Sequence, residues 1–441
     1  MLPPGPSTHR LIQTLQFTRD PFKFLDTCAN RYGETFTIHI TWFGNGNPMV
    51  VVSNPEQIKQ AFTERDILLG GKGKVQLGRL LGGHSLFVLD GPEHIRHRTL
   101  LMPAFAQSEY LESYGRTMLR LANASIDTWP VGKEFDLVPI FKELTTQVLI
   151  RCVLGVDEQA RVDRLAMLTR RTIEIAGSAI LMFPQVHKDL GPWSPWGKFL
   201  RTRNQLYQAM DEEIAARRAS PGTDILSVMV QARDENGTPM SEAELRDELL
   251  SVLVGGTDTT ATALGWTLCS LLRDPSLCQK LREEVATIVE GGQLSPARVN
   301  ELKLLDATVR EGLRLPPGAQ LVARVVTQPV QIGNYEVPAG WQVSPSMYLA
   351  HMRASAFRNP RRFDPERLLS SPPSVFEWLP FGGGAHRCIG QKFSSYQMKM
   401  VLATLFQRAR LRLKPAFVVR PVRRAVTMAP KEVPVILDAC N

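Results

Sequence analysis

The stretch Phe381-Gly382-Gly383-Gly384-Ala385-His386-Arg387-Cys388-Ile389-Gly390 decides the fold of this chain. A helical pattern begins at Gly390, so Cys388 stands between a glycine-rich loop and the amino end of a helix. Backbone N–H groups that are free in such a loop, together with the helix dipole, favour negative charge on the sulfur. The sequence therefore predicts a thiolate with a lowered pKa, which suits a metal ligand or a nucleophile.

Two alternatives to a metal ligand remain for Cys388, a nucleophile and a buried structural cysteine. A nucleophile needs a histidine base, and His386, on the same loop, is poorly placed for that role. The remaining cysteines form no Cys-x-x-Cys pair and have no histidines at zinc spacing. We expect these five to be small buried side chains in a reducing compartment: Cys28, Cys152, Cys269, Cys278 and Cys440.

The loop resembles the haem-binding loop of the cytochrome P-450 superfamily of haem-thiolate monooxygenases. The shared pattern is Phe-x-x-Gly-x-His-x-Cys-x-Gly, carried here by Phe381, Gly384, His386, Cys388 and Gly390. The resemblance implies that Cys388 is the axial ligand of the iron of haem b and that the other four residues contact the cofactor. It also implies that O2 is a co-substrate.

Two further segments resemble the charge cluster of this superfamily. Glu311-Gly312-Leu313-Arg314 resembles its Glu-x-x-Arg helix, and Arg367 of Phe363-Asp364-Pro365-Glu366-Arg367 resembles the arginine that completes the cluster. The i,i+3 spacing places Glu311 and Arg314 on one helix face. A buried glutamate needs more than one donor to offset its desolvation, and Arg367 can be the second.

A very long helix is expected to begin at Ser241, where Ser-x-x-Glu with Glu244 makes a capping box, and to run to about Arg273. Its middle holds Gly255-Gly256-Thr257-Asp258-Thr259-Thr260, a run that helix propensity alone would not select. Something at this point therefore needs an exposed backbone.

The same run resembles the oxygen-activating segment of the superfamily. In that comparison Gly255 and Gly256 let O2 approach the haem iron. Thr259 lies four residues after Gly255, so its hydroxyl can take the Gly255 carbonyl from the helical ladder. The resemblance implies that Asp258 and Thr259 relay protons to the oxygen.

The resemblance also supplies basic residues for the two haem propionates. They are His94 and Arg98 of a His-x-x-x-Arg pattern, Arg324 after the Glu-x-x-Arg helix, and His386 of the loop. Arginine suits a carboxylate because it can donate two parallel hydrogen bonds.

The rest of the chain agrees with an α+β, mostly α architecture, a helical body around haem with small β-sheets. The 441 residues are 44% hydrophobic and 22% charged, as in ordinary soluble globular proteins. Strand patterns gather at roughly 33–65 and 320–345, and helical spacing dominates elsewhere. No linker or repeat divides the chain, and the resemblance extends from about Arg31 to Pro430, so we expect one cytochrome P-450 domain over 1–441.

The formal net charge of +9 is scattered, which argues against a nucleic-acid partner. No apolar run of about 18 residues is present, so we expect no transmembrane anchor and a cytoplasmic protein. No nucleotide- or flavin-binding motif accompanies the haem loop, so electrons would come from a ferredoxin and its reductase. A basic cluster of Arg387, Lys392 and Lys399 would suit an acidic ferredoxin.

The expected substrate is an apolar small molecule, hydroxylated by one oxygen atom from O2. Positions that resemble substrate-contacting segments of the superfamily are mostly apolar: Leu86, Phe87, Val254, Thr257, Ala319, Leu321, Val322 and Met428. An apolar pocket suits a fatty acid or a terpene, and Lys72, Lys74 or Arg79 could hold a fatty-acid carboxylate.

Asp189 to Trp196 and Pro421 to Arg424 look most similar to a cyanobacterial branch that is linked to fatty acids and terpenes. Two other functions remain open. A peroxide-driven peroxygenase or isomerase on the same fold should lack the Asp258-Thr259 relay, and a non-enzymatic haem sensor would ordinarily carry an output domain.

Overall fold

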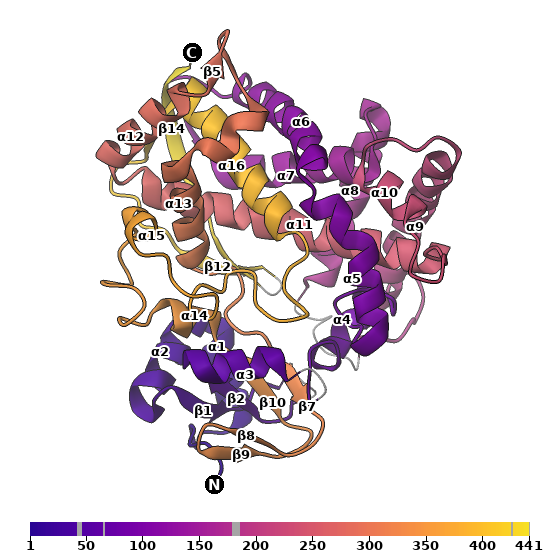
Figure 1. Cartoon of the computed structure of the whole chain (residues 1–441), viewed down its shortest axis with the longest axis vertical. Helices are drawn as coiled ribbons and strands as arrows, with labels where there is room; N and C mark the ends of the chain where they lie inside the picture. Colours follow the sequence, from indigo (N-terminus) through magenta and orange to yellow (C-terminus); the bar gives the residue numbers. More distant parts are fainter. Residues whose placement is uncertain (42–45, 65–66, 179–185, 425–426, 441) are drawn as a thin grey trace.

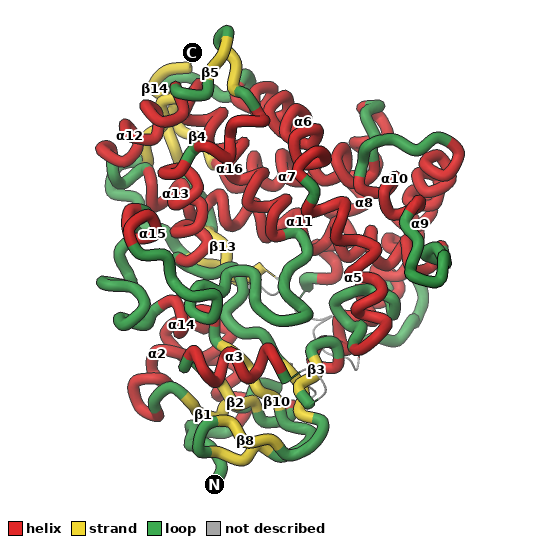
Figure 2. Tube along the Cα trace, in the orientation of Figure 1, coloured by secondary structure: helices red, strands yellow, loops and turns green. Residues whose placement is uncertain are grey.

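The computed structural model describes residues 1–441 except 42–45, 65–66, 179–185, 425–426 and 441 (Figure 1). Helices make up most of the described chain, and the largest sheet lies at one end, close to the amino terminus (Figure 2). The predicted α+β, mostly α architecture is therefore the observed one. Among the described residues no helix has the length and apolar character needed to cross a membrane.

The helical body is built around α11 (Glu242–Leu271), which runs through its middle (Figure 1). The remaining helices of the body are α4 (Val75–Leu81), α5 (Gly91–Ala106), α6 (Ser108–Ile126), α7 (Leu137–Leu154), α8 (Gln159–Ala176), α9 (Pro195–Ala219), α10 (Ile225–Gln231), α12 (Pro275–Ala286), α13 (Lys303–Arg314), α15 (Glu366–Ser370) and α16 (Gln391–Arg408). Short 3-10 helices span Lys72–Lys74 and Pro296–Glu301.

The start of α11 confirms the capping box. The Glu244 N–H donates to the Ser241 hydroxyl at 3.3 Å, and the Ser241 N–H donates to the Glu244 carboxylate at 2.6 Å. These bonds satisfy N–H groups that lack partners inside the helix. The predicted bounds of this helix are correct to within about two residues.

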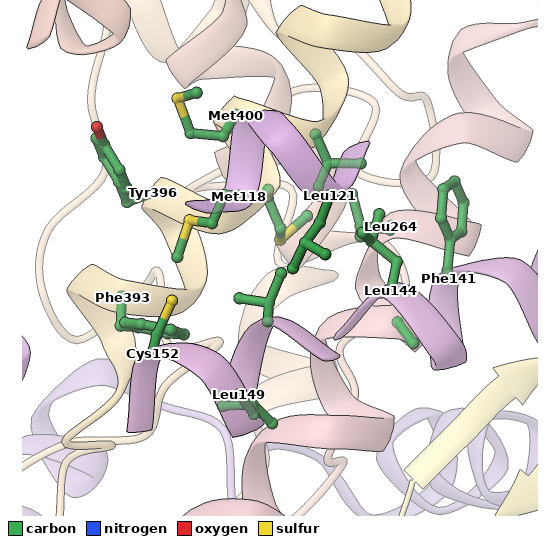
Figure 3. Packing of buried hydrophobic residues seen from close by; sticks show 14 of the residues in the cluster. Met118, Leu121, Phe141, Leu144, Leu149, Cys152, Leu264, Phe393, Tyr396 and Met400 are labelled. Atoms are coloured by element: carbon green, nitrogen blue, oxygen red, sulfur yellow. The ribbon is translucent and has the colours of Figure 1, made fainter. Parts of the chain in front are cut away.

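The largest apolar core lies where α6, α7, α11 and α16 meet (Figure 3). Met118 of α6, Leu144 of α7, Leu264 of α11 and Met400 of α16 are among its buried members. Burying such side chains is the main favourable contribution to folding. This core fixes α11 and α16, the two helices on which the predicted site depends.

The largest sheet joins the two strand-rich segments predicted from the sequence. Its order is β1 (Thr35–Ile38), β2 (Met49–Val52), β10 (Gln342–Pro345), β7 (Arg324–Val326) and β3 (Leu68–Leu69). Strands β2 and β10 are parallel, and the other pairs are antiparallel. Residues 42–45 and 65 of the first segment lie outside the described residues. The sheet thereby carries Arg324 to the neighbourhood of the Cys388 loop.

Helices α1 (Arg10–Arg19), α2 (Pro21–Tyr32), α3 (Pro55–Thr63) and α14 (Met347–His351) lie near this sheet (Figure 1). The smaller sheets are β4 (Glu134–Asp136) with β14 (Pro434–Cys440) and β11 (Ala409–Leu413), β5 (Val289–Glu290) with β6 (Gln293–Leu294), β8 (Val330–Ile332) with β9 (Tyr335–Val337), and β12 (Pro421–Arg424) with β13 (Thr427–Pro430).

Candidate functional site

The loop before α16 is a tight turn that only glycine permits at its centre. Gly382 and Gly384 have φ angles of +66° and +68°, a region that side chains with a Cβ rarely adopt. A Cβ on Gly384 would also overlap the carbonyl oxygen of Phe62 in α3. The Cys388 N–H donates to the Phe381 carbonyl at 3.0 Å, which closes the loop and fixes the direction of the cysteine.

Cys388 is an exposed residue, but the surrounding protein still keeps much of the solvent away from its sulfur. This desolvation is the largest influence on the thiol and raises its pKa. A hydrogen bond from the Gly390 N–H lowers the pKa, as do the charges of Arg98, Arg387 and Lys74. The net shift is upward, so the lowered pKa expected from the sequence was wrong. Ligation of a metal removes the proton from such a thiol outright.

Two arginines from distant elements hold the loop backbone. Arg98 of α5 donates to the carbonyl of Arg387 at 2.7 Å. Arg324 of β7 is buried, donates to the Gly383 carbonyl at 3.3 Å, and lies over the Phe62 ring at 5.2 Å. Both predicted basic residues therefore lie beside the cysteine loop.

The two predicted histidines lie together, with ring centroids 4.0 Å apart. Burial is the main cause that lowers the pKa of His94 to about 3, and burial also lowers the pKa of His386. The Nε2 atom of His386 is 3.0 Å from Oδ1 of Asp90. The same oxygen accepts the Gly71 N–H, and Oδ2 of Asp90 accepts the Lys72 N–H. The histidines are therefore neutral hydrogen-bonding groups near pH 7, and the positive charge beside the loop comes from the arginines.

The cations around this loop suit an anionic group. Burial lowers the pKa of Arg324 to about 10, and burial followed by the charge of Arg324 lowers the pKa of Lys74 to about 7. Among the described residues, Asp90 is the one carboxylate that acts on both. The Nδ1 atom of His386 is buried and has no described partner, but it carries no proton, because the one N–H of this neutral ring faces Asp90. The cations beside the exposed Cys388 are therefore the groups that fit haem, with its iron and its two propionates.

On α11, Thr259 and Asp258 have different partners. The Thr259 side chain is exposed, and its hydroxyl donates to the Gly255 carbonyl at 2.7 Å, as the four-residue spacing predicts. Asp258 forms an ion pair with Lys142 of α7, with 2.9 Å between the Lys142 Nζ and an Asp258 oxygen. Lys142 was not found from the sequence, because 116 residues separate it from Asp258.

Gly255, Gly256 and Thr257 of α11, which the sequence analysis assigned to oxygen access and substrate contact, have different surroundings. A Cβ on Gly255 would lie 3.5 Å from the Phe87 ring, whereas a Cβ on Gly256 would lie 2.9 Å from Leu149 of α7. Thr257 is buried, and its carbonyl accepts a hydrogen bond from Thr145 of α7. Gly256 therefore serves close packing of two helices, and the buried Thr257 hydroxyl, expected to contact substrate, donates to the Leu253 carbonyl of its own helix at 2.7 Å.

The predicted charge cluster is fully formed. Glu311 and Arg314 are both 0% exposed and share two hydrogen bonds of 2.8 Å. Arg367 approaches Glu311 at 3.2 Å, and the Asp364 N–H donates to Glu311 at 3.0 Å. Arg314 also donates to carbonyls, including that of His351. The glutamate thus has the several donors that its burial requires.

His351 of α14 links this cluster to the segment that leads to Cys388, and the sequence analysis missed it. Its Nε2 accepts the Leu379 N–H at 2.8 Å, so its Nδ1 carries the proton and donates to the Arg314 carbonyl at 3.2 Å. Burial, followed by the charge of Arg314, lowers the pKa of His351 to about 3. The imidazole is therefore neutral and holds one defined tautomer.

The predicted substrate residues do not form one group. Phe87 lies against Gly255, and the Lys74 Nζ is 5.7 Å from the Phe87 ring centroid. Leu86 and Val254 are half-buried against the main core, and Met428 is buried on β13. By contrast, the other three pack partly against cores beside the large sheet: Ala319, Leu321 and Val322.

The basic cluster near the loop is smaller than predicted. Lys399 is buried on α16, where it binds Asn300 at 2.6 Å and Asp306 at 3.2 Å. The sequence analysis grouped Lys399 with Arg387 and Lys392 from their spacing alone. Spacing along one helix cannot reveal that α13 covers Lys399. Arg387 and Lys392 remain exposed.

Comparisons with known proteins agree with this geometry. The family model described as Cytochrome P450 matches residues 3–436. The protein of Mycobacterium tuberculosis named cytochrome P450 135B1 is 34% identical over 434 residues, which cover 97% of this chain and 89% of that one. Cytochrome P450 138 of Mycobacterium bovis is 33% identical and covers 98% of this chain and 95% of its own.

Solved structures show the same similarity. A cyanobacterial CYP120A1 with bound retinoic acid has a TM-score of 0.86 and 25% identity, with 99% of each chain covered. The haem domain of cytochrome P450DA has a TM-score of 0.87 at 22% identity, with 99% of this chain and 97% of that one covered, and shares the fold. The architecture expected from the sequence is confirmed.

Proposed function

This chain belongs to the cytochrome P450 family of haem-thiolate monooxygenases, and on that premise we propose that it hydroxylates a fatty acid or a terpenoid. The observation that carries this proposal is the placement of the Phe87 ring against Gly255, with the Lys74 Nζ at 5.7 Å. An apolar wall beside one cation suits a long apolar molecule with a carboxylate. Retinoic acid, bound to the cyanobacterial relative, is such a molecule.

Haem b supplies the activation of O2 when it is bound, and the protein supplies its ligands and surroundings. Cys388 would hold the iron of haem through its thiolate, because the residue is exposed and its sulfur receives the Gly390 N–H. Arg98, Arg324 and the neutral His94 are assigned to the propionates, whereas His386 directs its one N–H to Asp90 and would line the cofactor site. Bidentate arginine favours carboxylates, and the neutral His94 can still donate one N–H.

Proton delivery is assigned to Asp258 and Thr259. The Lys142–Asp258 pair is partly solvated, with side chains 30% and 19% exposed, so water can reach Asp258. The exposed Thr259 hydroxyl follows it in the chain and holds a defined position through the Gly255 carbonyl. Asp258 pairs with a residue of α7, and Thr259 bonds the Gly255 carbonyl beside Phe87. The two side chains can therefore pass protons from the α7 side of α11 to the side that Phe87 faces.

Thr259→Ala is expected to uncouple electron use from oxygenation. Without the hydroxyl, no side chain at this position directs protons to the bound oxygen. Product formed per NADPH should therefore fall to about a tenth or less while NADPH oxidation continues. Product and NADPH are measured together in the haem-loaded enzyme. Ser270→Ala is the matched control, because its hydroxyl makes the same i−4 bond on α11 at 3.1 Å far from the Phe87 contact. Equal coupling in all three proteins would contradict the relay.

The substrate class is tested by titrating the ferric protein with a long-chain fatty acid, its methyl ester and a sesquiterpene, and following the Soret band. We expect saturable binding of the acid. Lys74→Met should weaken the acid about tenfold or more and leave the ester unchanged, because a charged hydrogen bond contributes about 1.5–3 kcal/mol. Equal loss for acid and ester, with reduced haem content, would instead assign Lys74 to a propionate. Binding of the sesquiterpene alone would exclude the fatty acid.

We propose an acidic ferredoxin with its reductase as the electron donor. Arg387, one residue before Cys388, and Lys392 of α16 are exposed and basic, and complementary charge speeds association. Turnover with NADPH, ferredoxin and reductase is compared with turnover by peroxide alone. Product with peroxide alone would favour the peroxygenase alternative, and no product in either case would favour a ligand-binding role.

A further inference from the structure

A buried polar cluster joins α5, α11 and the segment His84-Ser85-Leu86-Phe87, which we call segment 84–87. His97 of α5 lies between two glutamates one turn apart on α11. Its Nδ1 is 2.8 Å from Glu248 and its Nε2 is 3.0 Å from Glu244. The side chains of His97 and Glu248 are 3% and 1% exposed. None of these residues belongs to the haem or proton machinery described above.

The geometry of this cluster requires an additional proton. A neutral imidazole has one donor and one acceptor, whereas ionised carboxylates only accept. Burial raises the pKa of Glu248, whereas the hydrogen bonds from His97 and from the Leu86 N–H, the latter at 2.9 Å, lower it and favour the carboxylate. We therefore assign the additional proton to His97, which makes the arrangement an imidazolium between two carboxylates.

The same stretch of α11 holds segment 84–87 at three points. Leu86 is held by Glu248. The His84 N–H donates to Asp247 at 3.0 Å, and the Ser251 hydroxyl donates to the Ser85 hydroxyl at 2.7 Å. These groups lie one turn or less apart on α11. Because Phe87 follows directly, its contact with Gly255 depends on this attachment.

The other charged groups around the cluster are also paired. Arg96 of α5 binds Glu244 and Asp234, each at 2.7 Å. The Tyr207 hydroxyl of α9 donates to Asp247 at 2.9 Å, and α10, which packs on α5, has no charged residue. Arg96 is thus shared between Glu244 and Asp234. Among the described residues, the proton on His97 is the remaining positive charge that balances Glu248.

We propose that His97, Glu248 and Asp247 position segment 84–87 and so determine the size of apolar molecule that fits beside the Phe87 ring, a selection that loosens as His97 loses its proton. The three are positioning residues, since none touches the reacting atoms. The proposal rests on the proposed function, in which Phe87 borders the substrate.

The direction of the pH effect follows from the surroundings of His97. Burial alone would lower its pKa, but the hydrogen bonds and charges of Glu248 and Glu244 raise it above its usual value. The attachment is therefore complete below about pH 6.5 and is lost as pH rises through the raised pKa. Segment 84–87 should be least protected, and the space beside Phe87 largest, at alkaline pH.

The test compares the haem-loaded wild type with His97→Gln and with Arg164→Gln, which removes an exposed ion pair to Glu212. Amide hydrogen exchange of segment 84–87, corrected for the intrinsic effect of pH, is measured from pH 6 to pH 9. We expect protection in the wild type to fall with pH. In His97→Gln it should be about tenfold or more lower at pH 6 and independent of pH, while Arg164→Gln follows the wild type.

The second readout is the affinity of the ferric protein for 1-phenylimidazole relative to imidazole. We expect this ratio to rise in His97→Gln and, in the wild type, with pH. Equal protection in wild type and His97→Gln would overturn the attachment, and altered protection with an unchanged ratio would overturn its role in selection. Neither readout uses a fatty acid or terpenoid, so failure of those compounds to bind would overturn the proposed function separately. The wild-type pH series remains decisive if His97→Gln folds poorly.

Discussion

Cys388→Ser is expected to reduce oxygenation of any substrate to background while the protein stays folded. Serine is close to cysteine in size, so the glycine turn and the Cys388 N–H bond to Phe381 are kept. A serine hydroxyl holds its proton and donates far less electron density to iron than a thiolate, and thiolate donation favours O–O cleavage. Product formation with NADPH and external electron carriers is the measurement, with haem content determined in the same samples.

The matched control is Cys440→Ser. The sequence analysis expected Cys440 to be buried, but it is exposed because it is the last residue of β14. This variant should keep wild-type turnover, because β14 pairs with β4 and β11 in a separate sheet. Turnover of Cys388→Ser within a few-fold of this control would exclude Cys388 as the catalytic ligand.

Glu311→Ala is expected to destabilise the protein by about 3–5 kcal/mol, the usual cost of leaving one partner of a buried ion pair uncompensated. Arg314 is 0% exposed and would keep its charge and its carbonyl partners, but lose two bonds of 2.8 Å to carboxylate oxygens. Arg367 would also lose its contact at 3.2 Å. The free energy of unfolding is measured by urea denaturation of the haem-loaded protein.

Glu301→Ala provides the comparison, because Glu301 pairs with Arg298 at 3.0 Å on the surface, with side chains 57% and 37% exposed. An exposed pair of this kind contributes about 0–1 kcal/mol. A loss in Glu311→Ala no larger than that in Glu301→Ala would show that the buried cluster does not stabilise the fold.

Much of the architecture could be predicted from the sequence because its signals are local. The capping box of Ser241 and Glu244 fixes the start of α11, and the four-residue spacing fixes the bond from Thr259 to Gly255. The i,i+3 spacing likewise placed Glu311 and Arg314 together. In each case the partners lie within one helical turn, where spacing determines contact.

What could not be predicted depends on elements far apart in the chain. Phe62 of α3, whose carbonyl makes glycine necessary at Gly384, precedes the loop by more than 300 residues. The upward pKa shift of Cys388 arises from burial by the whole protein. Gly256 packs on Leu149, an assignment that requires the position of α7. Motif spacing identifies candidate groups, and tertiary packing decides which of them face the site.

X-ray absorption at the iron edge of the ferric, haem-loaded protein tests the central assignment most directly. The account predicts one sulfur among the iron ligands of the wild type and none in Cys388→Ser, with Cys440→Ser unchanged. Iron bound only by nitrogen and oxygen in the wild type would contradict the assignment of Cys388 as the thiolate ligand.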